Sequence, residues 1–169
     1  MNTGQTLLSI FALVLLGTTI ITVNRMYTQH GTVLEHTEIG IYATSLAMSI
    51  VEEASGQHFD DATVADAVTT TSSLTTPASL GPEAGETTVP ASTTLFNDFD
   101  DYNNLTMGVR VASIDSFTVK ASVYYINDTL PAVKSTTRTW FKRMDVSVFG
   151  SATSDTIKTS YIFSYFNFR

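Results

Sequence analysis

The chain has 169 residues, of which 43% are hydrophobic, and a net charge of −7 at neutral pH. It contains no cysteine, which excludes a disulfide-stapled fold, a thiolate zinc site and a thiol nucleophile. Because phosphate binding needs clustered Lys and Arg, the acidic balance predicts no contact with nucleic acid. A chain of this length suffices for one compact domain and one appendage.

An uncharged apolar segment begins the chain. Residues 1–24 contain no Asp, Glu, Lys or Arg, and Thr6–Val23 reads TLLSIFALVLLGTTIITV. About 20 apolar residues cross a bilayer as a helix. The run is longer than the apolar part of a secretory signal, and no obvious small-residue cleavage site follows it. We predict a membrane or filament-core segment with the apolar side chains Leu7, Leu8, Ile10, Phe11, Leu13, Val14, Leu15, Leu16, Ile20, Ile21 and Val23.

The helical pattern continues beyond this segment. Proline is absent from Thr6 to Ser55, which allows one helix about 75 Å long at a rise of about 1.5 Å per residue. Gly56 then provides a C-terminal stop. The predicted divisions are a helix over 1–55, made of 1–24 and an amphipathic part 25–55, and a head over 56–169, made of a loop-rich region 56–107 and a sheet 108–169.

The amphipathic part carries two apolar stripes on a helical wheel, at about 100° per residue. A helix that is covered only by its own domain needs one such stripe. The second stripe therefore predicts contact with another chain, through Leu34, Ile41 and Met48, which recur every seven residues. A helix buried deeply within a single domain is the alternative. The first stripe, expected to cover the head, consists of Ile39, Ala43, Leu46, Ala47, Ile50 and Ala54.

The region after the helix is rich in Ser and Thr. Eight of the eleven residues in Thr69–Ser79 are Ser or Thr, and prolines follow, which is typical of an exposed irregular loop. This composition suits O-glycosylation, and two Asn-x-Thr triplets suit N-glycosylation; undecorated loops are the alternative. The candidate glycosylation sites are Thr69, Thr70, Thr71, Ser72, Ser73, Thr75, Thr76, Asn104 and Asn127.

The last third of the chain predicts an antiparallel sheet. Apolar residues alternate strictly along 117–126, where Phe117, Val119, Ala121, Val123 and Tyr125 form one face. Asn127, Asp128 and Pro131 are expected to end that strand. The predicted fold class is α+β: a long N-terminal helix packed on a C-terminal antiparallel sheet of about four strands, which are 109–114, 117–126, 137–149 and 156–168.

Acidic residues dominate the middle of the chain. Met26–Val109 holds 12 acidic and no basic residues, which favours contact with the basic C-terminal part or with a second copy; an ordinary acidic surface is the alternative. Asp98, Asp100, Asp101 and Asn103 place oxygen ligands close together, as Ca²⁺ needs, and a solvated acidic turn is the alternative. We expect no other cofactor. The chain lacks a nucleophile elbow, a P-loop and a dinucleotide fingerprint, so we predict that it is not an enzyme.

The layout of apolar helix, amphipathic helix, variable loops and antiparallel sheet resembles that of type IV pilins and pseudopilins. The stretches GIYATSLAMSIVEEASGQHFDD (Gly40–Asp61), FNDFDDYNN (Phe96–Asn104), WFKRMDVSVF and TSYIFSYF are similar to segments of that family. Gln5 stands where family members usually carry a glutamate.

The resemblance implies a structural subunit of an extracellular filament, built by helical stacking of the N-terminal helices. It implies a precursor held in the inner membrane, partners in the pilus assembly machinery and in further copies of the chain, and a final place on the cell surface. Two alternatives remain. One is a minor pseudopilin of a secretion or DNA-uptake system, and the other is a single-span membrane protein whose head binds a ligand.

Overall fold

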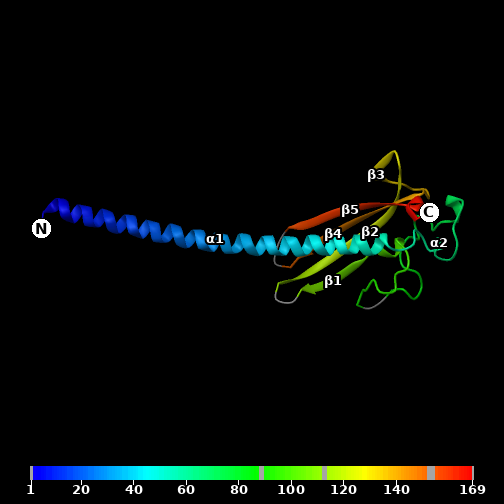
Figure 1. Ribbon diagram of the computed structural model, residues 1–169, viewed down its shortest axis with the longest axis horizontal. Helices are drawn as coiled ribbons and strands as arrows, with labels where there is room; N and C mark the ends of the chain where they lie inside the picture. Colours follow the sequence, from blue (N-terminus) through cyan, green and yellow to red (C-terminus); the bar gives the residue numbers. More distant parts are fainter. Residues whose placement is uncertain (1, 88–89, 112–113, 152–154, 169) are drawn as a thin grey trace. The chain divides into compact units, whose positions relative to one another are not determined.

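The computed structural model describes residues 2–87, 90–111, 114–151 and 155–168 (Figure 1). One long helix precedes a five-stranded antiparallel sheet, which confirms the predicted α+β class. The elements are α1 (Thr3–Ser55), α2 (Ala62–Ala65), η1 (Thr71–Ser73), η2 (Asp100–Tyr102), β1 (Thr106–Val111), β2 (Asp115–Asn127), β3 (Leu130–Lys134), β4 (Phe141–Gly150), β5 (Thr156–Ser164) and η3 (Tyr165–Phe168).

The chain forms two compact units, Met1–Glu38 and Ile39–Arg169. The helix α1 ends at Ser55, and its part from Ile39 onward belongs to the second unit. The reason is that the apolar stripe facing the sheet begins at Ile39, which is 4% exposed.

The first unit consists of helix alone, and its apolar side chains are exposed. Its hydroxyl groups bond within the helix: Thr18 and Thr19 donate to the Leu15 carbonyl at 2.9 and 2.8 Å, and Thr22 donates to the Thr18 carbonyl at 2.8 Å. Such internal bonding is what a helix in hydrocarbon requires. This stretch is long and apolar enough to cross a membrane, so it could be a membrane anchor or a signal sequence.

In the second unit the strands follow the order β1-β2-β4-β5, and β3 pairs with the end of β2. The two central strands are therefore β2 and β4, which pair from Phe117↔Gly150 to Tyr125↔Lys142. The alternation predicted along β2 is confirmed, because all five residues of its apolar face are at most 4% exposed.

One strand, β3, was not predicted. We expected Pro131 to end the preceding strand, yet it lies within β3, whose five residues are all exposed. Here β3 pairs only with β2, at Ile126↔Lys134 and Asn127↔Leu130. Proline is tolerated on such an edge strand, where its missing N–H group leaves no ladder bond unmade.

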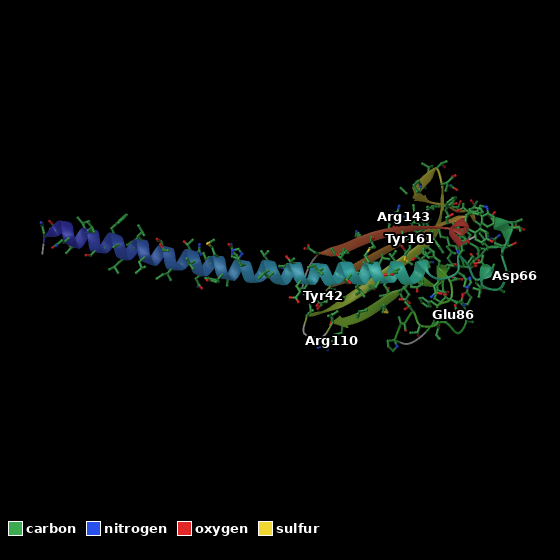
Figure 2. The ribbon with its side chains drawn as sticks, viewed as in Figure 1. Tyr42, Asp66, Glu86, Arg110, Arg143 and Tyr161 are labelled. Carbon is green, nitrogen blue, oxygen red and sulfur yellow. The ribbon has the colours of Figure 1, made fainter. Side chains whose placement is uncertain are left out.

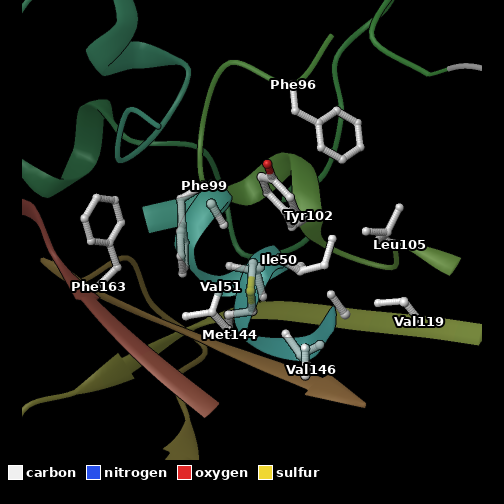
Figure 3. Close-up of a cluster of buried hydrophobic side chains, with 14 of the residues drawn as sticks. Ile50, Val51, Phe96, Phe99, Tyr102, Leu105, Val119, Met144, Val146 and Phe163 are labelled. Carbon is white, nitrogen blue, oxygen red and sulfur yellow. The ribbon is translucent and has the colours of Figure 1, made fainter. Parts of the chain in front are cut away.

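The core lies between the last turns of α1 and the sheet. Figure 1 shows these turns, in cyan, along the sheet, and Figure 3 shows Ile50 beside Met144 and Val146 of β4. The predicted inward stripe is confirmed: five of its members are at most 4% exposed, and Leu46 packs against them partly buried. Alanine at 43, 47 and 54 keeps this face of the helix small, which allows a close approach to the strands.

Asn104 joins η2 to β1 with a φ of 61°, in the left-handed region. Side chains with a Cβ are disfavoured there, and Asn is better tolerated than most. We expect Asn104→Ala to lower the free energy of unfolding by about 1 kcal/mol and Asn104→Gly to change it by only a few tenths. Urea denaturation of the full chain in detergent measures both. Equal losses for the two variants would contradict this assignment of strain.

Candidate functional site

Two acidic stretches lie side by side just beyond the end of α1. A parallel bridge joins His58 to Asp98, with the Phe99 N–H donating to the His58 carbonyl at 2.8 Å and the His58 N–H donating to the Asn97 carbonyl at 3.3 Å. This pairing aligns the sequence HFDD with NDFDD. Two pairs of carboxylates that are about 40 residues apart in sequence therefore meet in one region of the head.

The first feature of this region is a buried ion cluster around Lys142 on β4. Its Nζ donates to the Phe59 carbonyl at 2.7 Å and to Asp60 Oδ2 at 2.8 Å, and it also contacts Asp100 Oδ1. All three charged side chains are fully buried. The Lys142 ammonium also lies over the rings of Phe59 and Tyr125, 4.6 and 5.3 Å from their centroids.

Asp60 is fully hydrogen-bonded in this cluster. Besides Lys142, it accepts from the Thr75 N–H at 3.0 Å, from the Thr75 hydroxyl at 3.0 Å and from the Tyr125 hydroxyl at 3.0 Å. Burial opposes the charged form, but the Lys142 charge and these hydrogen bonds outweigh it and lower the pKa of Asp60 below its usual value. Asp60 therefore stays ionised and connects the end of α1, the loop after it and two strands.

The pKa of Asp100 shifts in the opposite direction from that of Asp60. Burial is the largest effect and raises the pKa of Asp100, although Lys142 acts in the opposite direction. One lysine thus serves two carboxylates, and Asp100 Oδ2 is buried without a hydrogen-bond partner.

The second feature is a group of five carboxylates, which we call the carboxylate cluster: Asp61, Glu83, Glu86, Asp98 and Asp101. Single carboxylate oxygens of Asp61, Glu83 and Asp98 lie within 4.8 Å of one another, and so do those of Glu83, Glu86 and Asp101. Glu83 belongs to both groups and is the centre of the cluster. Asp98 and Asp101 are fully buried, while Asp61 is exposed to solvent.

Backbone turns hold the buried members in place. Asp98 Oδ1 accepts the N–H groups of Asp100 and Asp101 at 2.7 and 3.2 Å, and Asp101 Oδ2 accepts those of Asn97 and Asp98 at 2.8 and 3.1 Å. Each carboxylate therefore has one oxygen fixed by backbone and a second oxygen, Asp98 Oδ2 or Asp101 Oδ1, that is buried without a hydrogen-bond partner.

Crowding of negative charge changes the acidity of these groups. Burial, a hydrogen bond with Glu86 and the charge of Asp101 raise the pKa of Glu83 to about 8. Burial and the neighbouring charge of Asp100 raise the pKa of Asp98 to about 9. Neutral pH therefore favours the protonated form of both groups unless another positive charge compensates them.

The four residues predicted as calcium ligands do not share one site. Asp98 and Asp101 lie in the carboxylate cluster, whereas Asp100 contacts Lys142. Asn103 is engaged elsewhere: its Nδ2 donates to the Leu80 carbonyl at 2.8 Å, and its Oδ1 accepts the Val123 N–H at 3.0 Å.

Sequence reasoning missed Asp61, Glu83 and Glu86. Asp61 could have been found from the acidic pair in HFDD, once that stretch was aligned with NDFDD. Glu83 and Glu86 lie in a loop 12–18 residues before Asp98 and Asp101, and no spacing rule links them to those residues or to Asp61.

The other predicted surface sites differ in accessibility. Among the stripe residues Leu34, Ile41 and Met48, the exposed fractions are 69%, 65% and 54%. Among the glycosylation candidates, Thr71 and Thr75 are half-buried, and Thr75 uses its hydroxyl on Asp60. The remaining candidates are exposed, namely Thr69, Thr70, Ser72, Ser73, Thr76, Asn104 and Asn127.

Comparisons with protein-family models, with curated proteins and with solved structures find no match to this chain.

Proposed function

We propose that this chain is a structural subunit of a pilus-like extracellular filament, assembled from a membrane-inserted precursor by stacking of the N-terminal helices. The observation that carries the proposal is the exposed apolar surface of α1. None of the 18-residue window that is apolar enough to span a membrane is buried by the rest of the chain. Water is a poor environment for such a surface, so lipid or other protein must cover it.

The second apolar stripe favours other copies of the chain over lipid alone. Leu34, Ile41 and Met48 lie beyond the apolar segment, and Ile41 and Met48 face away from the buried stripe of the same helix. Spaced every seven residues, they suit a neighbouring helix. A protein that is merely anchored by one span has no evident use for them. Heterologous contacts of this kind repeat without closing and build an open filament.

The exposed apolar area of α1 favours contacts with several neighbouring helices. Burial of apolar surface contributes about 25 cal/mol per Å², so each exposed Val, Leu, Ile or Phe of α1 contributes about 1.5–3 kcal/mol when a neighbour covers it. The apolar segment has eleven such large side chains, all exposed. The free energy contributed by each contact is modest, and the sum over several neighbours is large.

The double variant Ile41→Lys/Met48→Lys tests the proposal. Both positions are exposed in the single chain, so the fold should remain intact, whereas two buried lysines per contact should abolish assembly. Negative-stain microscopy of material sheared from producing cells measures assembly, and urea denaturation of the purified chain in detergent checks the fold. The matched control is Thr44→Lys/Ser49→Lys, at exposed positions on either side of the stripe.

Fibres from the wild type and the control, but none from the stripe variant, are the expected result. Intact fibres from the stripe variant would show that Ile41 and Met48 make no subunit contact. A wild-type chain that stays in the membrane fraction and gives no fibres would contradict a filament subunit. That result would favour a minor pseudopilin or an anchored binding domain.

A further inference from the structure

We propose that the carboxylate cluster is a calcium site in which Asp61, Glu83 and Asp98 supply the protein ligands, with the adjoining group Glu83, Glu86 and Asp101 beside it. The site is independent of filament assembly. It would bind a hard divalent cation through carboxylate oxygens, and it lies where three loop segments meet beyond the end of α1.

The distances fit calcium. Ca²⁺ binds oxygen at about 2.4 Å, so oxygens bound to one ion lie no more than about 4.8 Å apart. Both triplets of the carboxylate cluster meet this limit, and they share Glu83. Mg²⁺ demands a near-ideal octahedron and usually keeps several of its waters, so a protein site built from several carboxylates suits Ca²⁺ better. Nitrogen and sulfur ligands are absent from both triplets, which disfavours zinc.

The unpartnered oxygens give independent support. In the described part of the chain, five buried side-chain polar atoms lack a hydrogen-bond partner, and all five are oxygens of this region. Native proteins rarely leave buried polar atoms unpaired, because each costs about 1–3 kcal/mol. Asp98 and Asp101, both 0% exposed, each hold one oxygen by backbone N–H groups and leave the other free. The five unpartnered oxygens are Glu83 Oε2, Asn97 Oδ1, Asp98 Oδ2, Asp100 Oδ2 and Asp101 Oδ1.

The charge balance points in the same direction. Around the cluster and the Lys142 ion pairs lie seven carboxylates, and within the described residues Lys142 is the only cation that pairs with any of them. Arg110 and Arg143 do not supply the missing charge, since both lie well apart from Glu86 in Figure 2. Instead Arg143 pairs with Asp145 at 2.8 Å. A divalent cation would remove most of this repulsion.

An ion can reach the carboxylate cluster from solvent, and its binding would hold the surrounding loops together. Asp61 is exposed and Glu83 and Glu86 are half-buried, so an ion reaches the buried oxygens from solvent through these three. Bound calcium would join the loop that carries Glu83 to the turn that carries Asp98. The loop region would then be ordered by the ion as well as by the Asp60 hydrogen bonds.

Calcium titration of the full chain, purified in non-ionic detergent and stripped with chelator, tests the proposal. Isothermal titration calorimetry should show saturable binding with a dissociation constant of about 10⁻⁵–10⁻³ M. Thermal unfolding, followed by the fluorescence of Trp140, should shift upward by about 4 °C or more in 10 mM CaCl2. An equal concentration of MgCl2 should give a smaller shift.

Two variants assign the site. Glu83→Gln and Asp98→Asn should weaken calcium binding by at least about tenfold, since each removes a charged ligand. Because each also removes repulsion, neither should lower the unfolding temperature of the calcium-free chain. Asp128→Asn, in the exposed turn between β2 and β3, is the matched control and should keep the full calcium response.

No heat and no thermal shift in the wild type at 10 mM CaCl2 would overturn the proposal. An undiminished response in Glu83→Gln and Asp98→Asn would also overturn it, because the ion would then bind elsewhere. Loss of the response together with a lower unfolding temperature in the calcium-free state would mean that the two side chains act structurally and not as ligands.

Discussion

Lys142→Met should destabilise the head by about 3–5 kcal/mol, because it leaves two buried carboxylates, Asp60 and Asp100, without their cation. This loss is a large part of the roughly 5–15 kcal/mol that stabilises a typical domain. It should appear in urea denaturation of the full chain in detergent as a lower midpoint with an unchanged slope. Methionine keeps the length of the side chain, so the effect reports the charge rather than a cavity.

Two further variants separate charge from packing. Lys158→Met removes a lysine from an exposed position on β5 and should change the free energy of unfolding by at most about 0.5 kcal/mol. Adding Asp100→Asn to Lys142→Met removes one of the uncompensated charges and should recover part of the loss. A loss below about 1 kcal/mol for Lys142→Met would show that the ion cluster is not buried as described.

Phe163→Ala should cost about 3–5 kcal/mol, since it removes a fully buried aromatic ring from the centre of the core. The ring centroid lies 4.8 Å from that of Phe99 and 5.8 Å from that of Phe59. Both neighbours flank residues of the ion cluster, so the cavity would also loosen the support of Asp60 and Asp100. The same urea denaturation, with a thermal melt as a second measurement, determines the loss.

Ile162→Ala is the matched control for Phe163→Ala. Ile162 is the preceding residue of β5, faces away from the core and is 43% exposed. Its truncation should cost about 1 kcal/mol or less. Comparable losses for the two variants would mean that β5 is not oriented with Phe163 inward.

The fold class and both stripes of α1 follow from periodicity alone. Strict alternation along β2 and the 3.6-residue spacing from Ile39 to Ala54 each specify which face is buried, because burial follows the geometry of the element. The edge strand β3 carries no such signal, since all five of its residues are exposed and it contains Pro131. Its existence depends on pairing with β2, which is a tertiary effect.

The candidate site was only half predictable for a similar reason. Asp98 and Asp101 are close in sequence, and each carboxylate accepts the other residue's backbone N–H, so a local turn positions both whatever the rest of the fold does. Glu83 joins them only because the loop folds back, and Asn103 leaves them because Val123 of β2 needs an acceptor. Likewise the excess of acidic residues in the middle of the chain did not reveal that Asp60, Asp98, Asp100 and Asp101 are interior groups, because composition carries no burial signal.

The position of Asp60 has a mechanical consequence. It lies five positions after Ser55, the last residue of α1, and its partners Tyr125 and Lys142 belong to the two central strands. A pulling force along α1 would therefore reach the two central strands through these charged and hydrogen-bonded contacts. The apolar contacts between α1 and the sheet would carry part of the same force. The edge strands β1, β3 and β5 would bear little of that tension, so the head is built to transmit force without peeling from an edge.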